Sequence, residues 1–267
     1  MKPITNLLKL GSFSGSQWVG LGLLTLLLSL VAINALFYAH DPALQNLENT
    51  FASASIAEPL GTDHFGRSNL ARLSSAILKS LLMALFTVAT SALLGVSAGV
   101  LAGWKAGWWD RCCSFAANII LALPGLILVL LFGALRPGSF IILYFAISLI
   151  QWVEYFRVIR SRTRALIPST EASRLYGFGD WYIFRRHLWP ELRSDIFTLA
   201  CFGAGNAILA LASIGFLYVG LKPPEAELGL LMVEHLKYIS QAPWLLLLPI
   251  GAVLLLVGSF HLLVRSA

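Results

Sequence analysis

The architecture of this chain is clearest at residues 169–190, which read Ser169-Thr-Glu-Ala-Ser-Arg-Leu-Tyr-Gly-Phe-Gly-Asp-Trp-Tyr-Ile-Phe-Arg-Arg-His-Leu-Trp-Pro190. This segment, called the knuckle below, lies inside the longest charged stretch, residues 157–193, which apolar runs precede and follow. We expect a short helix, a glycine stop, a turn and a second short helix. A two-helix loop on one face of a membrane protein is suited to docking a soluble partner. The alternative is a solvated hairpin at the membrane interface, anchored by Trp181 and Trp189.

Individual residues define the expected helix ends. Ser169 or Thr170 can supply the N-cap oxygen of the first helix, and Glu171 then lies in its first turn, where it complements the helix dipole. Gly177 can take the left-handed conformation that ends a helix. Asp180 can cap the second helix, which is expected to stop before the proline that closes the quoted segment.

The composition is that of a membrane protein. The 267 residues are 58% hydrophobic and 12% charged, with a mean hydropathy of +0.79. Soluble domains carry about 25% charged residues, so a soluble core of this size could not bury so much apolar surface. The net charge of +6 would suggest nucleic acid in a soluble protein, but the bias of basic residues toward the cytoplasmic side explains it better here.

Six apolar runs approach or exceed the ~20 residues that cross a bilayer. We therefore predict an all-α polytopic protein, a single transmembrane domain over residues 1–267, with both termini inside and residues 157–193 as a cytoplasmic loop between the fourth and fifth spans. The expected spans are 17–38, 76–103, 112–135, 139–156, 195–220 and 242–264, and residues 39–75 form the long outer loop.

Basic residues favour this orientation by thirteen to six. The inner segments hold Lys2, Lys9, Lys105, Arg111, Arg157, Arg160, Arg162, Arg164, Arg174, Arg185, Arg186, Arg193 and Arg265. The outer segments hold Arg67, Arg72, Lys79, Arg136, Lys222 and Lys237. The first span is longer than the 7–15 apolar residues of a signal peptide and lacks a clear cleavage site, so we expect an uncleaved anchor.

Small residues predict close helix packing. Gly95, Gly99 and Gly103 recur every four residues and share one helical face, which allows another helix to approach closely. Residues 203–215 are similarly rich in glycine, alanine and serine. Such faces pack within the chain or against a second membrane subunit.

Three residues inside spans are candidates for the translocation path. Pro124 removes a backbone hydrogen bond and kinks its helix, either statically or beside a moving pathway. Asn118 and Asn206 need partners in lipid, which they find across helices or by lining a pore.

The outer loop contains the segment Leu60-Gly-Thr-Asp-His-Phe-Gly-Arg67, called the signature loop below. Gly61 and Gly66 permit unusual backbone angles, and Thr62 and Asp63 can cap neighbouring amides. The alternative is an amphipathic lead-in to the second span that lies on the membrane surface.

No metal site or catalytic centre is predicted. Cys112, Cys113 and Cys201 lack ligand spacing and are expected to be small packing residues. The five histidines are scattered over both sides. His64 and His235 could both face outside and touch a metal or its chelate, but plain polar surface residues are the preferred interpretation.

The order of motifs resembles binding-protein-dependent ABC importer permeases of the dipeptide/oligopeptide/nickel class. Glu171-Ala-Ser, Gly177 and His187-Leu-Trp-Pro190 match the spacing of the "EAA" loop, with Ser173 in place of an alanine and Trp189 in place of a leucine. The signature loop resembles the outer-loop motif of that class. Further matches are Trp152, Tyr155, Arg157, Arg160, Gly220-Leu-Lys-Pro-Pro224 and Ala242-Pro-Trp244 with Pro249.

The resemblance implies a permease subunit in a bacterial inner membrane, importing a peptide, nickel, another metal chelate or a similar solute. It implies as partners a second homologous permease, an ATP-binding cassette ATPase dimer and an extracytoplasmic solute-binding protein, with lipid around the spans and no nucleic acid. ATP and magnesium would bind the ATPase, because this chain lacks a G-x-x-x-x-G-K-[ST] loop and needs no cofactor. The expected ATPase-docking residues are Glu171, Ala172, Ser173, Arg174, Gly177, Asp180, Arg185, Arg186 and Pro190.

The sequence disfavours two other functional classes. A secondary transporter driven by an ion gradient usually needs a titratable group in the membrane and often an inverted repeat, and neither is evident. A membrane-embedded enzyme would need paired carboxylates, metal-spaced ligands or a nucleophile with its base, and the sequence offers none of these patterns.

Overall fold

The computed structural model describes residues 14–264, which form helices and no strand; Thr62 and Ser68 make an isolated bridge. The elements are α1 (Gly15–Ile33) with a π turn (Asn34–Tyr38), a 3₁₀ turn (Leu47–Asn49), α2 (Asn69–Lys105), α3 (Gly107–Leu121), α4 (Gly125–Leu135), α5 (Phe140–Leu175), α6 (Asp180–Ile183) with a π turn (Phe184–Leu188), α7 (Trp189–Phe216), α8 (Leu228–Leu236) and α9 (Pro243–Leu263).

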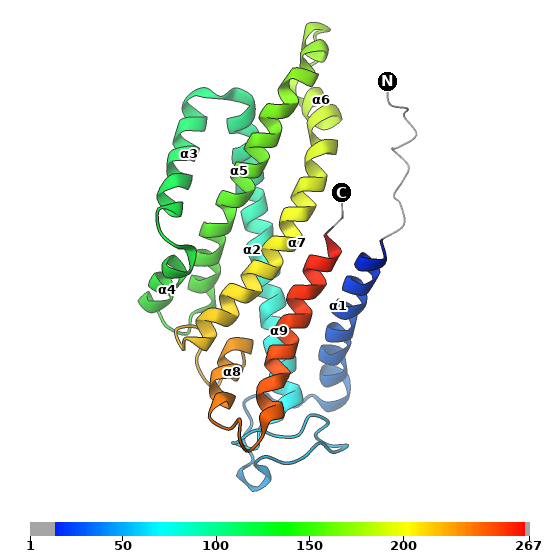
Figure 1. Ribbon diagram of the computed structural model, residues 1–267, viewed down its shortest axis with the longest axis vertical. Coiled ribbons are helices and arrows are strands. Elements are labelled where there is room, and N and C mark those ends of the chain that lie inside the picture. The colour runs from blue at the N-terminus through cyan, green and yellow to red at the C-terminus, as the bar shows by residue number, and fades with distance from the viewer. Residues whose placement is uncertain (1–13, 265–267) are drawn as a thin grey trace.

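The helices form an elongated bundle with two different ends (Figure 1). The turn between α5 and α6 projects at one end, and α1 begins and α9 finishes toward the same end. The loop before α2 and the segment around α8 lie at the other, called the outer-loop end below. Lys2, Lys9 and Arg265 lie outside the described residues.

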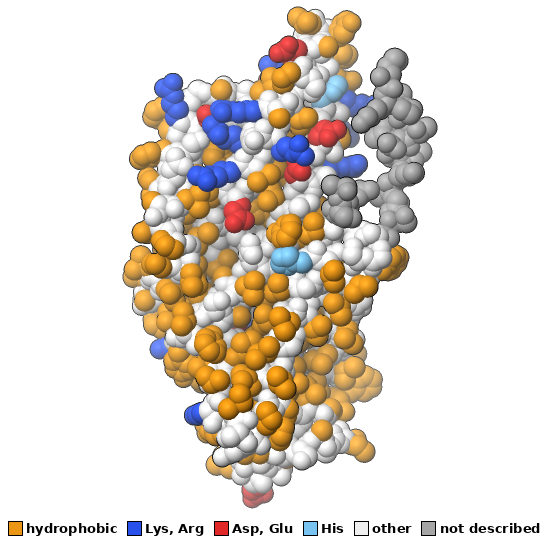
Figure 2. All heavy atoms as spheres, viewed as in Figure 1, with side chains coloured by type: hydrophobic (Ala, Val, Ile, Leu, Met, Phe, Trp, Pro, Cys, Tyr) orange, Lys and Arg blue, Asp and Glu red, His pale blue; other side chains and the backbone are white. Residues whose placement is uncertain are grey.

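Five helical segments within residues 14–264 are long and apolar enough to cross a membrane, and the pair α3 and α4 would make a sixth. Figure 2 shows charged side chains gathered over the knuckle end of the visible face and hydrophobic side chains over the part below it. The chain is therefore an all-α polytopic membrane protein. Which end faces the cytoplasm stays a prediction.

The third predicted span, 112–135, differs from the expected kinked helix. Residues 122–124 interrupt it, and α3 and α4 meet at an angle of 80°. Pro124 stands directly before α4 and Gly125 begins it. Because proline disfavours the helical conformation in the residue before it and cannot donate a hydrogen bond, the chain breaks here instead of bending.

The fourth predicted span, 139–156, is only the first half of a longer helix. α5 runs for 36 residues, about 54 Å at 1.5 Å per residue, which exceeds the thickness of a bilayer core. One continuous helix therefore connects the apolar part of the bundle to the knuckle.

The predicted glycine face forms the contact between α2 and α5. A Cβ atom at Gly95 would lie 2.4 Å from Cβ of Tyr155 and 2.6 Å from the carbonyl oxygen of Trp152. At Gly103 it would lie 2.7 Å from Cβ of Thr163. The two backbones pack so closely that only hydrogen fits at these positions.

We expect Gly95→Ala to destabilise the protein by about 1–3 kcal/mol, because the added methyl group must displace backbone of α5. The matched control is Gly251→Ala in α9, where no atom lies within 4 Å of the new Cβ. It should be neutral or stabilising, since alanine is favoured over glycine in a helix. Thermal unfolding in detergent measures both, and equal midpoints for the two variants would contradict the packing.

Candidate functional site

The knuckle exposes apolar side chains at the tip of the molecule. Leu175 is 90% exposed, Tyr176 82% and Trp181 71%. The tip lies beyond the region where charged side chains gather, and hence away from the apolar belt (Figures 1 and 2). Exposed apolar patches of this kind mark interaction surfaces.

Gly177 ends α5 in the conformation expected from the sequence. Its φ is +82°, and the amide of Phe178 donates to the carbonyl of Ser173 at 3.1 Å while the amide of Gly177 donates to the carbonyl of Arg174 at 2.9 Å. This pair of bonds is a Schellman motif, which satisfies carbonyls at the helix end and requires the left-handed residue.

The expected caps around Gly177 are wrong. Ser169 and Thr170 do not start a helix, because α5 continues through Pro168 to Leu175. Their hydroxyls donate to the carbonyls of Leu166 and Ile167 within the same helix. Glu171 therefore lies near the end of α5 and not in a first turn.

The second arm of the knuckle also differs from expectation. Gly179 is the N-cap of α6 and Asp180 is its first residue, with no side-chain cap bond. The helix does not stop before Pro190: α6 passes through a π turn into α7, and Pro190 occupies the first turn of α7.

Contacts hold the two arms together. The hydroxyl of Ser173 and Nε2 of His187 lie 3.0 Å apart, and Arg174 approaches Asp180 at 3.9 Å. The Arg174 guanidinium also lies 5.4 Å from the centroid of the Trp104 ring of α2. These contacts fix the two helical arms of the knuckle relative to each other and to α2.

The predicted docking residues divide by exposure. Glu171, Ala172, Asp180, Arg185 and Arg186 are exposed, whereas Ser173 and Pro190 are partly buried. Below them, Arg160 and Arg164 both pair with Asp110 of α3, and Arg162 pairs with Asp195 of α7. Such pairs connect α5 to its neighbours, while Arg185 and Arg186 have no ion-pair partner within residues 14–264.

The signature loop forms a second, buried cluster at the outer-loop end. Oδ1 of Asp63 accepts hydrogen bonds from the amides of Phe65 and Arg67, and its Oδ2 accepts from Nε of Arg67 at 2.6 Å. Arg67 and Arg72 both donate to Glu234 of α8, at 3.2 and 2.5 Å. Asp63 and both arginines are buried, so this segment is built into the fold.

Glycine is required within this cluster. Gly66 has φ of +68°, and a Cβ there would lie 1.7 Å from the carbonyl oxygen of Asn46. Gly61 has φ of +66° and a similar contact with Ala52. The hydroxyl of Thr62 accepts from the amide of Ala52 at 2.8 Å, so it caps a residue distant in sequence.

Burial and charge set the protonation of this region. Burial alone would raise the pKa of Asp63, but the hydrogen bonds and positive charge of Arg67 outweigh it and hold that pKa below its usual value. Burial lowers the pKa of His235 to about 4 and lowers that of His64 as well. Asp63 is therefore ionised and both imidazoles are neutral at pH 7.

The three residues predicted to line the translocation path do not form one site. Asn118 of α3 accepts a hydrogen bond from Arg157 of α5 at 2.9 Å. This agrees with the first of the two alternatives, a partner on another helix. Asn206 is exposed on α7, and Pro124 lies at the break between α3 and α4. None of them lines the cavity described next.

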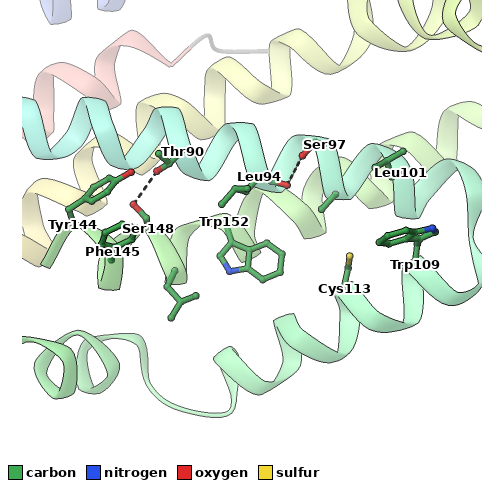
Figure 3. Close-up of a pocket in the computed structure, with 12 residues that line it drawn as sticks. Thr90, Leu94, Ser97, Leu101, Trp109, Cys113, Tyr144, Phe145, Ser148 and Trp152 are labelled. Carbon is green, nitrogen blue, oxygen red and sulfur yellow. Dashed lines mark hydrogen bonds between the residues drawn. The ribbon is translucent and has the colours of Figure 1, made fainter. Parts of the chain in front are cut away.

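A largely apolar cavity of about 530 Å³ lies between α2, α3 and α5. Figure 3 shows Trp109 and Cys113 of α3 facing Leu94 of α2 and Trp152 of α5 across it, with Thr90 and Ser148 hydrogen-bonded at 3.2 Å. Sequence reasoning missed this cavity. The available signal was the pair of small polar residues Thr90 and Ser97, which are seven positions apart and so share one face of α2.

Comparisons with known proteins agree with this architecture. Residues 95–265 match the family described as binding-protein-dependent transport system inner membrane component. A dipeptide transport system permease protein (DppC) of Alkalihalophilus pseudofirmus is 28% identical over 92% of this chain and 81% of its own length. A glutathione transport system permease protein (GsiD) of Pectobacterium atrosepticum is 30% identical over 92% of this chain and 83% of its own.

A second GsiD, from Escherichia coli O1:K1, is 30% identical over 90% of this chain and 81% of its own length. The family match covers more than half of the chain and includes the knuckle, α7 and α9, the segments whose geometry is described above. The chain belongs to the family of inner membrane components of binding-protein-dependent transport systems and is a permease subunit of an ABC importer.

Proposed function

We propose that this chain forms half of the translocation path of a peptide importer in a bacterial inner membrane, and that its knuckle docks a separate ATPase. The exposed apolar tip formed by Leu175, Tyr176 and Trp181 carries this proposal. No other described part of the chain covers it, and a protein partner that buries these side chains would account for their exposure.

The surface around the tip fits such a partner. Glu171 and Asp180 offer negative charge, and Arg185 and Arg186 offer positive charge that no described group neutralises. Mixed charge around an apolar centre is the usual anatomy of a protein interface. In this proposal ATP and magnesium bind the ATPase dimer, and this chain provides the surface on which the ATPase docks.

The length of α5 supports a lever mechanism. Because α5 is continuous from the knuckle to its close contact with α2, a displacement at Gly177 is carried along a helix to the apolar bundle. ATP would then bias the spans between inward-open and outward-open states. This coupling requires that the nucleotide-bound ATPase bind the two states with different affinities.

The cargo proposed is a peptide or a similar small solute. The relatives named above are permeases for dipeptides and for glutathione, a tripeptide, which supports this class over the nickel or metal-chelate cargo that the class also suggests. A second, homologous permease would complete the path, and a solute-binding protein would deliver the cargo at the outer-loop end.

Replacement of Gly177 by valine should impair uptake while membrane insertion stays normal. Positive φ is costly for a β-branched residue, and no atom lies within 4 Å of the new Cβ, so the effect acts through the backbone alone. Gly179→Val is the matched control, because Gly179 has φ of −70° and equally open space. Uptake per inserted molecule measures both variants, and normal uptake by Gly177→Val would refute the role of the Schellman motif.

Glu171→Lys should reduce recovery of the ATPase with this chain in mild detergent. The substitution reverses a charge on the exposed face of the proposed dock. Glu48→Lys makes the same charge change on an exposed residue of the outer loop and should leave recovery unchanged. Equal recovery of the ATPase with both variants would exclude Glu171 from the dock, and recovery with neither variant nor the parent chain would refute the docking proposal.

A further inference from the structure

Three potential metal ligands meet where the signature loop packs against α8. Asp63, His64 and His235 each place one ligand atom so that all three lie within 4.8 Å of one another. The sequence separates His64 from His235 by most of the chain, and folding brings their rings to a centroid distance of 6.3 Å in an edge-to-face arrangement. The histidines therefore pair, contrary to the interpretation from sequence.

His235 is held with one free nitrogen. The residue is 3% exposed, and its Nδ1 lies 2.9 Å from the carbonyl oxygen of Leu245. A carbonyl oxygen only accepts, so Nδ1 carries the proton and Nε2 carries the lone pair. Nε2 is buried and has no hydrogen-bond partner within residues 14–264. A histidine oriented by a backbone carbonyl on one nitrogen, with the other nitrogen free, has the arrangement typical of a metal ligand.

His64 offers a second free nitrogen. Its Nδ1 is buried and has no hydrogen-bond partner in the described part of the chain. The ring stacks on Tyr238 at a centroid distance of 4.6 Å and an angle of 27°, and Phe51 packs edge-on against the same tyrosine. Two buried nitrogens without donors at one place are rare unless something absent from the chain itself satisfies them.

Asp63 retains capacity for a further ligand. A carboxylate has about four acceptor positions, and Asp63 uses two on Oδ1 and one on Oδ2, while Nε of Arg72 stays 3.6 Å from Oδ2. The positive charges of Arg67 and Arg72 are opposed by those of Asp63 and Glu234. These four side chains are together neutral, and Lys237, which acts on His64 as well, adds one positive charge that the bonds to the three ligands must outweigh.

We propose that Asp63, His64 and His235 bind one divalent transition-metal ion of the zinc type. Two imidazoles and a carboxylate suit such an ion and not magnesium or calcium, which prefer oxygen ligands. Ligands lie about 2.0–2.2 Å from a zinc ion, so an ion bound to all three residues would connect the signature loop to α8.

A cavity of about 710 Å³ adjoins the site at His64, at the outer-loop end. His64, Arg67, Glu234 and Lys237 are among its lining residues, and it gives water or an exchangeable ligand access to the site. In this inference the ion is a clamp between two segments of this chain. It is independent of the solute that is transported, and so of the proposed function.

Cobalt titration of the detergent-purified permease complex, isolated without a polyhistidine tag and stripped with EDTA, tests the site. Four-coordinate Co²⁺ absorbs in the visible range, and Zn²⁺ should displace it. We expect His64→Ala to weaken Co²⁺ binding by roughly tenfold or more, since even loss of an outer-shell partner has effects of that size. Zn²⁺ should raise the unfolding temperature of the parent complex and not that of the variant.

His40→Ala is the matched control, because His40 is another outer-loop histidine beside a carboxylate, 3.3 Å from Glu58. It should bind Co²⁺ as the parent does. His64→Gln, closer in size, is measured in parallel and replaces His64→Ala if the alanine variant folds poorly. Absence of the visible bands in the parent complex, or equal Co²⁺ affinity in the parent and His64 variants, would overturn the proposal.

Discussion

Close backbone contact between α2 and α5 is the interaction around which this bundle is built. In lipid, helices gain little from burying apolar surface, so van der Waals contact between backbones is a principal source of association. Gly95, Gly99 and Gly103 provide that contact because a side chain at any of them would meet α5. α3, by contrast, buries only Ala117 and leaves a cavity along the same two helices. The bundle thus contains one closely packed helix pair, α2 and α5, and one loosely packed helix, α3.

Much of the fold was predictable from local patterns. Long apolar runs marked the spans, four-residue glycine spacing marked the packed face, and Gly177 marked a helix end. These features depend on neighbours in sequence or on one helical period, which a single chain displays directly. The bend between α3 and α4 was half predictable, since Pro124-Gly125 marked the place but not whether the helix would kink or break.

Other features depend on competition or on distant residues and escaped prediction. Ser169 and Thr170 are residue types favoured as N-caps, but their hydroxyls can also donate to carbonyls three residues earlier inside a helix. In this chain they do so, and α5 continues through them. The ion pairs from Glu234 to Arg67 and Arg72, and the approach of His64 to His235, join segments far apart in the chain. No local pattern specifies such pairs.

The exposed tip of the knuckle has a consequence for how the protein is made. Leu175, Tyr176 and Trp181 protrude into water whenever the chain stands alone, although its spans are already inserted in the bilayer. An unassembled copy therefore resembles a misfolded protein at one point of its surface, where proteases and chaperones recognise apolar side chains. If the knuckle docks the ATPase as proposed, the lifetime of each copy is linked to its capture by that partner.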